Sequence, residues 1–462
     1  MSLRNDKRQN IQFELDFSCK PTGEARKADG EETESLPTVK GSESPAGTDR
    51  LMEEVCEREN LKEALRRVKA NRGSAGVDRM TVGQLTDCLK QHWPGIREQL
   101  LKGAYEPKPV KRVEIPKPDG GVRKLGIPTV LDRFIQQAVM QVLQRRWDRT
   151  FSEHSYGFRP GRSAHQAVAQ AQRYIAEGNG WVVDLDLEKF FDRVNHDKLM
   201  GQIAKRVEDK RLLKLIRAFL NAGVMENGLV SPSGEGTPQG GPLSPLLSNL
   251  VLDELDRELE RRGHRFVRYA DDSNIYVRSE RAGQRVMEGV TRFITQKLKL
   301  KVNEAKSAVG RPQERKFLGF SFTEGPEVKR VIAPKALGRF KQRIREITRR
   351  AKSVSMETTI EELAPYMRGW RNYFGFCETP EVLMYLTRWV RLRLRAALWR
   401  QWKTQRRRRA ALMALGVGQR LARNTAGSGH GPWYLARSKA LSVGLSNTHF
   451  RSLGLPSLID GC

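Results

Sequence analysis

Residues 266–277 read FVRYADDSNIYV, in which two runs of strand-forming residues flank a short Ala-Asp-Asp turn. This pattern predicts a β-hairpin with the carboxylates of Asp271 and Asp272 at its tip. Adjacent aspartates raise each other's pKa unless a cation lies between them, and hard cations such as Mg²⁺ prefer oxygen ligands. The hairpin is therefore either a solvated turn or part of a cation site, and a third carboxylate elsewhere would favour the cation site.

That third carboxylate lies in residues 181–187, which read WVVDLDL. Alternation predicts a strand with Val183, Leu185 and Leu187 on one face and Val182, Asp184 and Asp186 on the other. Two-metal phosphoryl transfer uses carboxylates that hold two ions roughly 3.5–4 Å apart. Asp186 next to the Asp-Asp hairpin would supply such a site, and Asp184, on the same face as Asp186, is the alternative ligand.

Several ordered blocks of this chain resemble group II intron reverse transcriptases/maturases. The segment DLEKFFD at residues 186–192 and the YADD hairpin resemble motifs A and C of reverse transcriptases. Further matching blocks are IPKPDGGVRKLGIPT (115–129), FSEHSYGFRPGRS (151–163), TPQGGPLSP (237–245) and KFLGF (316–320). The resemblance runs from about Leu51 to the end, and several blocks in order are far more specific than any one of them.

The resemblance is to the compact bacterial class C lineage in particular. Longer members of the family end in a nuclease domain with His-Asn-His chemistry and paired cysteines, and this sequence reaches Cys462 without either. The resemblance therefore implies a protein that cannot cut the second target strand and needs a primer from elsewhere.

The expected fold is α+β, a right-hand polymerase with fingers and a palm built on a mixed sheet. An all-helical thumb and a small basic C-terminal DNA-binding region follow. Residues 1–50 should be disordered, because Cys19 to Arg50 are rich in Gly, Ser, Glu, Pro and Thr. The expected domains are a helical extension of the fingers (51–110), fingers and palm (111–325), the thumb or maturase-specific domain (333–400) and the basic region (401–462).

For the chemistry, the resemblance implies that Asp186, Asp271 and Asp272 are the catalytic carboxylates. Together with Leu187, they form the expected ligand set for two Mg²⁺ ions. Lys306, in the segment VNEAKS (302–307), matches the lysine that protonates the leaving pyrophosphate. A surface lysine would look the same in the sequence, so that alternative stays open.

Four residues are expected to bind the incoming nucleotide. Phe191 matches the aromatic residue that lies under the sugar and excludes a 2′-hydroxyl, with ordinary packing as the alternative. Lys117 and Arg123 flank the fingers turn and would grip the β- and γ-phosphates, unless they belong to a solvated basic hairpin. Gln239 lies in a Pro-Gln-Gly-Gly loop, which lines the nucleotide and primer pocket in the family.

The charge predicts a polyanionic partner. The chain has 83 Lys and Arg against 54 Asp and Glu, a net charge of +29, and residues 331–462 carry 25 against 7, or +18 of that total. Five of eight tryptophans lie in the same stretch, either as helical core anchors or as stacking surfaces. The candidate RNA- and DNA-binding residues are Arg159, Arg162, Arg406, Arg407, Arg408 and Arg409.

The predicted function is an RNA-directed DNA polymerase that copies intron RNA into cDNA during retrohoming and a maturase that assists splicing. The expected partners are group II intron RNA, primer–template RNA/DNA, target DNA and dNTPs. Three alternatives remain: an RNA-dependent RNA polymerase, an RNA-binding splicing factor, and a domesticated reverse transcriptase with a defence role. A C-terminal tail that only grips duplex is the alternative to intron binding.

The remaining sequence signals are negative ones. The five cysteines include no C-x-x-C pair, so neither a zinc site nor a disulfide framework is predicted. No run of 18 apolar residues exists, so no membrane partner is expected. The predicted location is cytoplasmic, with nucleoid association when the protein is bound to target DNA.

Overall fold

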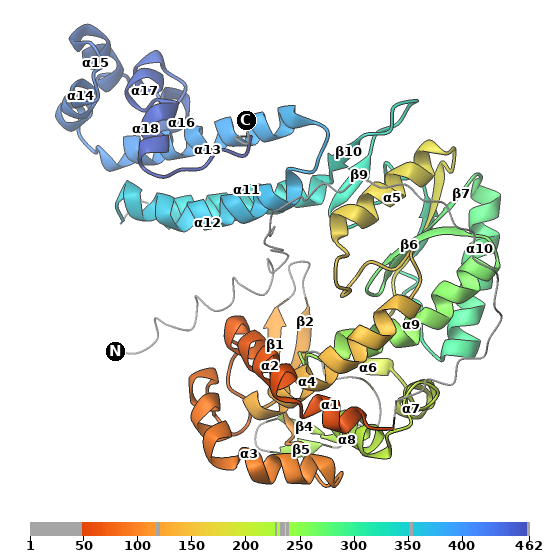
Figure 1. Cartoon of the computed structure of the whole chain (residues 1–462). Coiled ribbons are helices and arrows are strands. Elements are labelled where there is room, and N and C mark those ends of the chain that lie inside the picture. Colours follow the sequence, from red (N-terminus) through yellow and green to blue (C-terminus); the bar gives the residue numbers. More distant parts are fainter. Residues whose placement is uncertain are drawn as a thin grey trace, which may run out of the picture. The chain divides into compact units, whose positions relative to one another are not determined.

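The computed structural model describes residues 49–116, 121–226, 229–231, 236, 240–350 and 354–459 (Figure 1). The predicted disorder of residues 1–50 falls almost wholly outside these ranges. The chain divides into two compact units, with the boundary between Arg315 and Lys316. This division lies upstream of the boundary that the sequence predicts between residues 325 and 333.

The N-terminal unit contains two four-stranded sheets and the helices around them. Its helices are α1 (Leu51–Val55), α2 (Arg58–Asn71), α3 (Leu85–Leu101), α4 (Val130–Trp147), α5 (Ala164–Ala176), α6 (Phe190–Arg193), α7 (His196–Ala204), α8 (Lys210–Asn221), α9 (Ser244–Arg261) and α10 (Glu280–Phe293). Its strands are β1 (Val110–Pro116), β2 (Val122–Ile127), β3 (Trp181–Leu185), β4 (Val224–Glu226), β5 (Leu229–Ser231), β6 (Arg265–Tyr269), β7 (Asp272–Val277) and β8 (Ala308–Gly310).

The sheet that carries the acidic strands has the order β6-β7-β3-β8, with every neighbouring pair antiparallel. Helices α5, α9 and α10 contact its strands. In the register of β3 and β7, Asp184 lies opposite Asn274 and Leu185 opposite Ser273. The chain leaves β3 immediately before Asp186, so this residue lies at the end of the sheet where the β6–β7 turn also lies.

The second sheet has the order β2-β1-β4-β5, in which β1 pairs antiparallel with β2 and parallel with β4. Arg123 of β2 lies opposite Ile115 of β1. The strands on either side of the predicted fingers turn, which Lys117 and Arg123 are expected to flank, are therefore present, and residues 117–120 between them lie outside the described residues.

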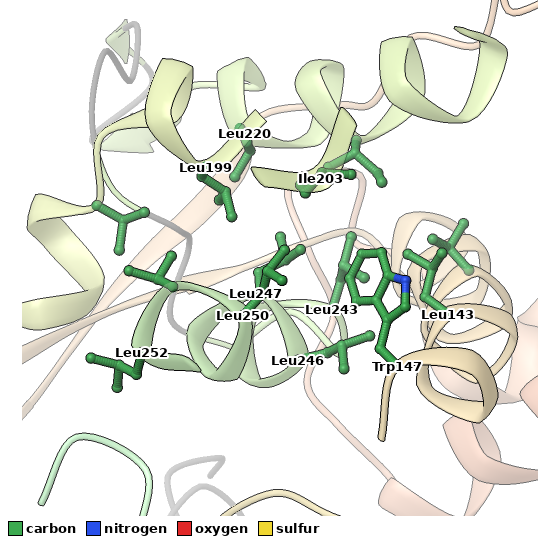
Figure 2. Packing of buried hydrophobic residues seen from close by; sticks show 14 of the residues in the cluster. Leu143, Trp147, Leu199, Ile203, Leu220, Leu243, Leu246, Leu247, Leu250 and Leu252 are labelled. Carbon is green, nitrogen blue, oxygen red and sulfur yellow. The ribbon is translucent and has the colours of Figure 1, made fainter. Parts of the chain in front are cut away.

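A leucine-rich core holds the N-terminal unit together. Figure 2 shows Leu246, Leu247 and Leu250 of α9 packed among side chains of α4, α7 and α8, including Trp147 and Leu220. Pro245 in the first turn of α9 has a backbone conformation suited to a helix start. Each leucine buried in this way contributes about 1.5–3 kcal/mol relative to exposure. The helix that supports the β6 strand is thus firmly anchored.

The C-terminal unit is mainly helical. A short antiparallel pair, β9 (Phe320–Phe322) and β10 (Arg330–Ile332), precedes the helices. These are α11 (Pro334–Arg350), α12 (Met356–Phe374), α13 (Pro380–Gln401), α14 (Gln405–Ala414), α15 (Gln419–Ala426), α16 (Pro432–Leu435), α17 (Lys439–Gly444) and α18 (Asn447–Ser452). The predicted mixed α/β region followed by a helical C-terminal region is confirmed.

The aromatic residues of this unit are mostly core residues. Trp370, Trp389 and Trp399 are buried, and the Trp370 ring lies 4.5 Å from that of Phe340. Trp433 differs, because 38% of it is exposed. The core-anchor alternative therefore holds for these three tryptophans and for Trp402, which is partly buried against the same core, and leaves Trp433 as a surface residue. Among the described residues, no helix combines the length and apolar character needed to cross a membrane.

Candidate active site

The predicted acidic hairpin is confirmed as β6 and β7. Tyr269 pairs with Asp272, which leaves Ala270 and Asp271 as the two turn residues. Ala270 has a φ of +57°, in the left-handed region that non-glycine residues seldom occupy. Asp271 is half-buried in the turn, whereas Asp272 is exposed at the start of β7.

Asp186 is held by the loop that follows residue 301. Its amide donates to Oγ of Ser307 (3.0 Å), and its carbonyl accepts from the amide of Asn303 (2.8 Å). Nδ2 of Asn303 also donates to Oδ2 of the Asp186 carboxylate (3.0 Å). The next residue, Leu187, forms a single antiparallel bridge with Val302. Both the backbone and the carboxylate of Asp186 are therefore fixed.

Lys306 belongs to the same loop, and its Nζ lies 3.2 Å from Oδ2 of Asp186. The lysine side chain is 66% exposed, so its charge is open to a ligand from solvent. The sequence left open whether Lys306 is only a surface residue. The structure places it at the carboxylate that the sequence singled out.

Asp186 and Asp271 influence each other electrostatically. Burial raises the pKa of the Asp271 carboxyl, and the negative charge of Asp186 also raises it, whereas a backbone hydrogen bond and the charges of Arg123 and Arg268 act to lower it. Two neighbouring carboxylates whose negative charges repel each other favour a cation between them. Their oxygen atoms are the ligands that a divalent metal such as Mg²⁺ prefers, whereas the Lys306 ammonium beside Asp186 offsets part of the negative charge.

The third predicted carboxylate, that of Asp272, begins β7 directly after Asp271 and is exposed. Within the described ranges, no three His, Cys, Asp or Glu side chains gather closely enough to hold a metal ion. The roles of Asp186, Asp271 and Asp272 as metal ligands therefore stay predictions.

Asp184, the alternative ligand, has a different environment. Its Oδ2 accepts from Nη2 of Arg315 (2.9 Å), and the same Nη2 donates to the backbone carbonyl of Lys306 (2.8 Å). Asp184 is therefore engaged in anchoring the loop that carries Lys306. This arrangement favours Asp186 over Asp184 as the ligand.

The predicted nucleotide-binding residues are only partly described. Lys117 and Gln239 lie outside the described residues. Arg123 is exposed on β2, and its charge acts to lower the pKa of Asp271, so β2 and the turn lie within electrostatic reach. Gly240, which follows Gln239, has a φ of +129°, and a Cβ there would lie 2.8 Å from the carbonyl oxygen of Gly126. Only glycine allows the loop to pass so close to β2.

Phe191 lies in α6, five residues after Asp186. It is half-buried, and its ring meets that of the buried Phe190 edge to face, with centroids 5.3 Å apart. One part of the ring is thus held by the core while another remains accessible. This position is compatible with both the steric gate and ordinary packing.

The two candidate arginines of the 151–163 block differ sharply. Arg159 is 8% exposed, and its guanidinium donates to the Asp148 carboxylate and to the backbone carbonyls of Asp148, Ser152 and Ser155. These bonds hold the fold together, which departs from the predicted contact with nucleic acid. Arg162 lies 5.5 Å over the ring of Tyr156 and pairs with Glu153 near the surface.

The basic cluster of α14 is also divided. Arg406 and Arg407 are exposed, as expected for phosphate-binding residues. Arg408 instead lies 4.7 Å over the Trp399 ring, and its Nε donates to the carbonyl of Trp402 (2.9 Å). Arg408 thus packs against the helical core, which departs from its predicted role in binding. Arg409 is half-buried.

Sequence reasoning missed the residues that support the site. Asn303 and Ser307 lie in the segment VNEAKS (302–307), in which the resemblance points to Lys306 alone. Arg268 precedes the acidic turn and is fully buried. Its signal in the sequence was a lone charge within FVRY, where the neighbouring strand residues are apolar or aromatic.

Two family models match this chain. The one described as reverse transcriptase (RNA-dependent DNA polymerase) covers residues 115–322, and the one described as group II intron, maturase-specific domain covers residues 337–415. The first contains Asp186, Asp271 and Lys306. The second begins within α11 and ends just after α14.

Several known proteins are similar to this chain. Protein YkfC of Escherichia coli (strain K12) is 38% identical over 219 residues, 46% of this chain and 58% of that protein. The group II intron-encoded protein LtrA of Lactococcus lactis subsp. cremoris is 32% identical over 314 residues, 54% of this chain and 52% of that protein. A chain of a solved partial Cas6-RT-Cas1–Cas2 complex aligns at 25% identity with a TM-score of 0.35, covering 53% of this chain and 42% of that one.

The matches to these two curated relatives span little more than half of the relatives' length. The two family matches nevertheless follow each other in one chain, and the match to LtrA extends over more than half of this sequence. The chain therefore carries a reverse transcriptase domain over residues 115–322, followed by a group II intron maturase-specific domain over residues 337–415, and it is homologous to the group II intron-encoded protein LtrA.

Proposed function

We propose that this chain is an RNA-directed DNA polymerase that copies intron RNA into cDNA during retrohoming. The observation that carries the proposal is the pair Asp186 and Asp271, which two strands of one sheet bring within electrostatic reach inside the reverse transcriptase match. The proposed layout is a right hand. Residues 51–110 extend the fingers, 111–325 form fingers and palm, and 333–400 form the thumb.

Asp186 and Asp271 would hold the divalent metal, with Asp272 and Leu187 proposed to complete the ligands of two Mg²⁺ ions. Bound there, Mg²⁺ would supply activation of the attacking hydroxyl and neutralisation of the charge on the leaving group. The support for this assignment is that burial and the negative charge of Asp186 both raise the pKa of the Asp271 carboxyl, and that the two carboxylates offer the oxygen ligands that Mg²⁺ prefers.

In the proposed reaction, the 3′-hydroxyl of the primer attacks the α-phosphorus of a dNTP. A new P–O bond forms, and the bond to pyrophosphate breaks. Arg123 and Lys117 would attract the triphosphate, since guanidinium and ammonium groups bind phosphate oxygens strongly. Lys306 would donate a proton to the departing pyrophosphate, because its exposed ammonium lies at the Asp186 carboxylate. Gln239 would line the pocket for nucleotide and primer.

Phe191 would select deoxyribonucleotides. Its support against the buried Phe190 limits how far the ring can move when a ribose approaches. The same residue separates this proposal from an RNA-dependent RNA polymerase, which would have to accommodate the 2′-hydroxyl at this position.

The C-terminal unit is proposed to bind group II intron RNA and assist splicing, and residues 401–462 to contact RNA or target DNA. Exposed Arg406 and Arg407 support this part, together with the net +18 beyond residue 330. Basic side chains neutralise phosphates and release their counterions, so this kind of binding weakens as the salt concentration rises. A cytoplasmic location, with nucleoid association on target DNA, belongs to the same proposal.

The test uses a primed RNA template, dNTPs and Mg²⁺. Replacing Asp271 and Asp272 together with alanine should abolish incorporation while leaving the melting temperature within a few degrees of wild type. Undiminished synthesis by the double variant would overturn the assignment. If neither protein makes DNA but both bind and splice the intron RNA, the splicing-factor alternative replaces the polymerase.

A further inference from the structure

Arg268 lies in β6, one residue before Tyr269, and its side chain is fully buried together with that of Asp256. Removing two charges from water costs several kcal/mol per ion, and a well-packed apolar pair is often as stable. A buried ion pair is thus weak evidence for a role in stability. Its geometry suggests what else it does.

Each of the five N–H donors of the Arg268 guanidinium has an acceptor, which is the full capacity of this group. Nε and Nη2 donate to the two carboxylate oxygens of Asp256 (2.8 and 2.6 Å), Nη2 also to Oγ of Ser155 (2.7 Å), and Nη1 to Oδ1 of Asn249 (3.0 Å) and the carbonyl of Ala270 (2.9 Å). One planar group therefore joins α9, the segment around Ser155 and the acidic turn.

The bond to Ala270 reaches the acidic turn itself. The carbonyl of Ala270 belongs to the peptide unit that continues into Asp271, and Ala270 has the left-handed φ of +57°. For an alanine this conformation costs roughly 1–2 kcal/mol. An interaction that fixes its carbonyl therefore stabilises a turn which would otherwise relax.

The same network holds the turn from its other side. Nδ2 of Asn249, whose Oδ1 accepts from Arg268, donates to the carbonyl of Gly157 (2.8 Å). A Cβ on Gly157 would lie 2.2 Å from the backbone nitrogen of Ala270. The segment that contains Gly157 is also hydrogen-bonded to β6. The Arg268 amide donates to the carbonyl of His154 (2.9 Å), and the Tyr156 amide donates to the carbonyl of Arg268 (2.9 Å).

We propose that Arg268 is the positioning residue of this site: its guanidinium, oriented by Asp256, fixes the Ala270–Asp271 turn and so places the Asp271 carboxylate relative to Asp186. The inference rests on the proposed function, because Asp271 is taken as a metal ligand. The inference also goes beyond that function, because it assigns a shared role to residues 151–163, α9 and the acidic hairpin. All three are joined through Arg268 and together hold the Asp271 carboxylate in place. Arg268 touches no reacting atom.

The test compares Arg268→Lys with wild type in the full chain. Lysine keeps the positive charge beside Asp256 but lacks the fork that reaches Ala270. With primed RNA, kcat should fall on the order of 100-fold, which is the effect expected when a catalytic group is displaced by about 1 Å. The KM for dNTP and the affinity for primer–template should stay within about twofold, because those contacts lie elsewhere.

A matched control is Arg206→Lys. Arg206 also donates to an α9 carboxylate, that of Asp253 (2.9 Å), and its other side-chain contacts among the described residues are with Thr150 and Phe151, not with the hairpin. Its kcat should equal that of wild type. An equal loss of kcat in both variants would mean a general effect of α9 ion pairs and would overturn the proposal, as would an unchanged kcat in a folded Arg268→Lys protein.

Gly157→Ala supplies a second, independent variant if Arg268→Lys does not fold. Its methyl group displaces the turn and leaves the ion pair intact, so the same selective loss of kcat is expected, and retention of wild-type kcat contradicts the proposal.

A measurement without catalysis separates this proposal from the proposed function. Mn²⁺ binding to the protein alone, followed by electron paramagnetic resonance, should weaken at least tenfold in Arg268→Lys and stay unchanged in Arg206→Lys. Equal Mn²⁺ affinity in all three proteins overturns the positioning role. If the three proteins bind Mn²⁺ in this expected order but wild type makes no DNA, the positioning role stands and the polymerase assignment fails.

Discussion

Nζ of Lys306 lies 3.2 Å from Oδ2 of Asp186, although 120 residues separate the two in the chain. The contact exists because Ser307 and Asn303 attach the Lys306 loop to the backbone of Asp186, and Arg315 attaches it to Asp184. If Asp186 is the metal ligand proposed above, a lysine held at its carboxylate is suitably placed to meet the phosphates of a bound nucleotide.

Lys306→Ala should therefore lower kcat by on the order of 100-fold, the lower range for loss of a general acid. Lys306→Arg should be nearly as slow, because arginine keeps its proton. Lys301→Ala is the control, since Lys301 is similarly exposed and pairs with Glu188 at 3.1 Å. Single-turnover incorporation measures all three, and wild-type rates for Lys306→Ala would restore the surface-lysine interpretation.

Phe191→Ala should raise the rate of rNTP incorporation relative to dNTP, because the ring that would meet the 2′-hydroxyl is gone. Phe191→Tyr, which keeps the ring, should discriminate as wild type does. The ratio of kcat/KM for dCTP and CTP measures the effect. If wild type shows no preference for dCTP, Phe191 is a packing residue only.

Arg159→Ala should destabilise the N-terminal unit by roughly 3 kcal/mol, as expected when one partner of a buried ion pair is removed. Its side chain is 3% exposed, against 25% for Arg162. Arg162→Ala should therefore change the free energy of unfolding by less than about 1 kcal/mol. Urea denaturation compares the two, and equal values would contradict the structural role given to Arg159.

The exposed pair Arg406 and Arg407 should dominate the salt dependence of RNA binding. Replacing both with alanine should reduce the slope of log K against log salt by about 1.5–2, whereas Arg408→Ala should leave it unchanged. Arg408→Ala should instead lower thermal stability, because its guanidinium lies over Trp399. A slope that changes equally in both proteins would show that Arg408 also reaches phosphate.

Much of this site could be predicted from local sequence. The acidic hairpin follows from two strand-forming runs and a turn, and the strand before Asp186 from strict alternation. The structure confirms both elements. The roles of Asp186, Asp271, Asp272, Lys117 and Gln239 stay predictions, and the last two lie outside the described residues.

What the sequence could not supply depends on distant contacts. Arg159 and Arg162 lie three residues apart with the same chemistry, and only the position of Asp148 makes one of them structural. Arg406 to Arg409 look equivalent until Trp399 engages Arg408. The role of Arg268 depends on Asp256, twelve residues earlier on another element, and on Ser155 much further away.

The most direct measurement is extension of a DNA primer on an RNA template by wild type and Asp186→Asn in Mg²⁺ and dNTPs. Asparagine keeps the size of the side chain and loses the charge, so melting temperature and template binding should match those of wild type. We expect full-length cDNA from wild type and at least a thousandfold slower synthesis from Asp186→Asn. Equal rates for two folded proteins would mean that Asp186 and Asp271 do not form the polymerase site.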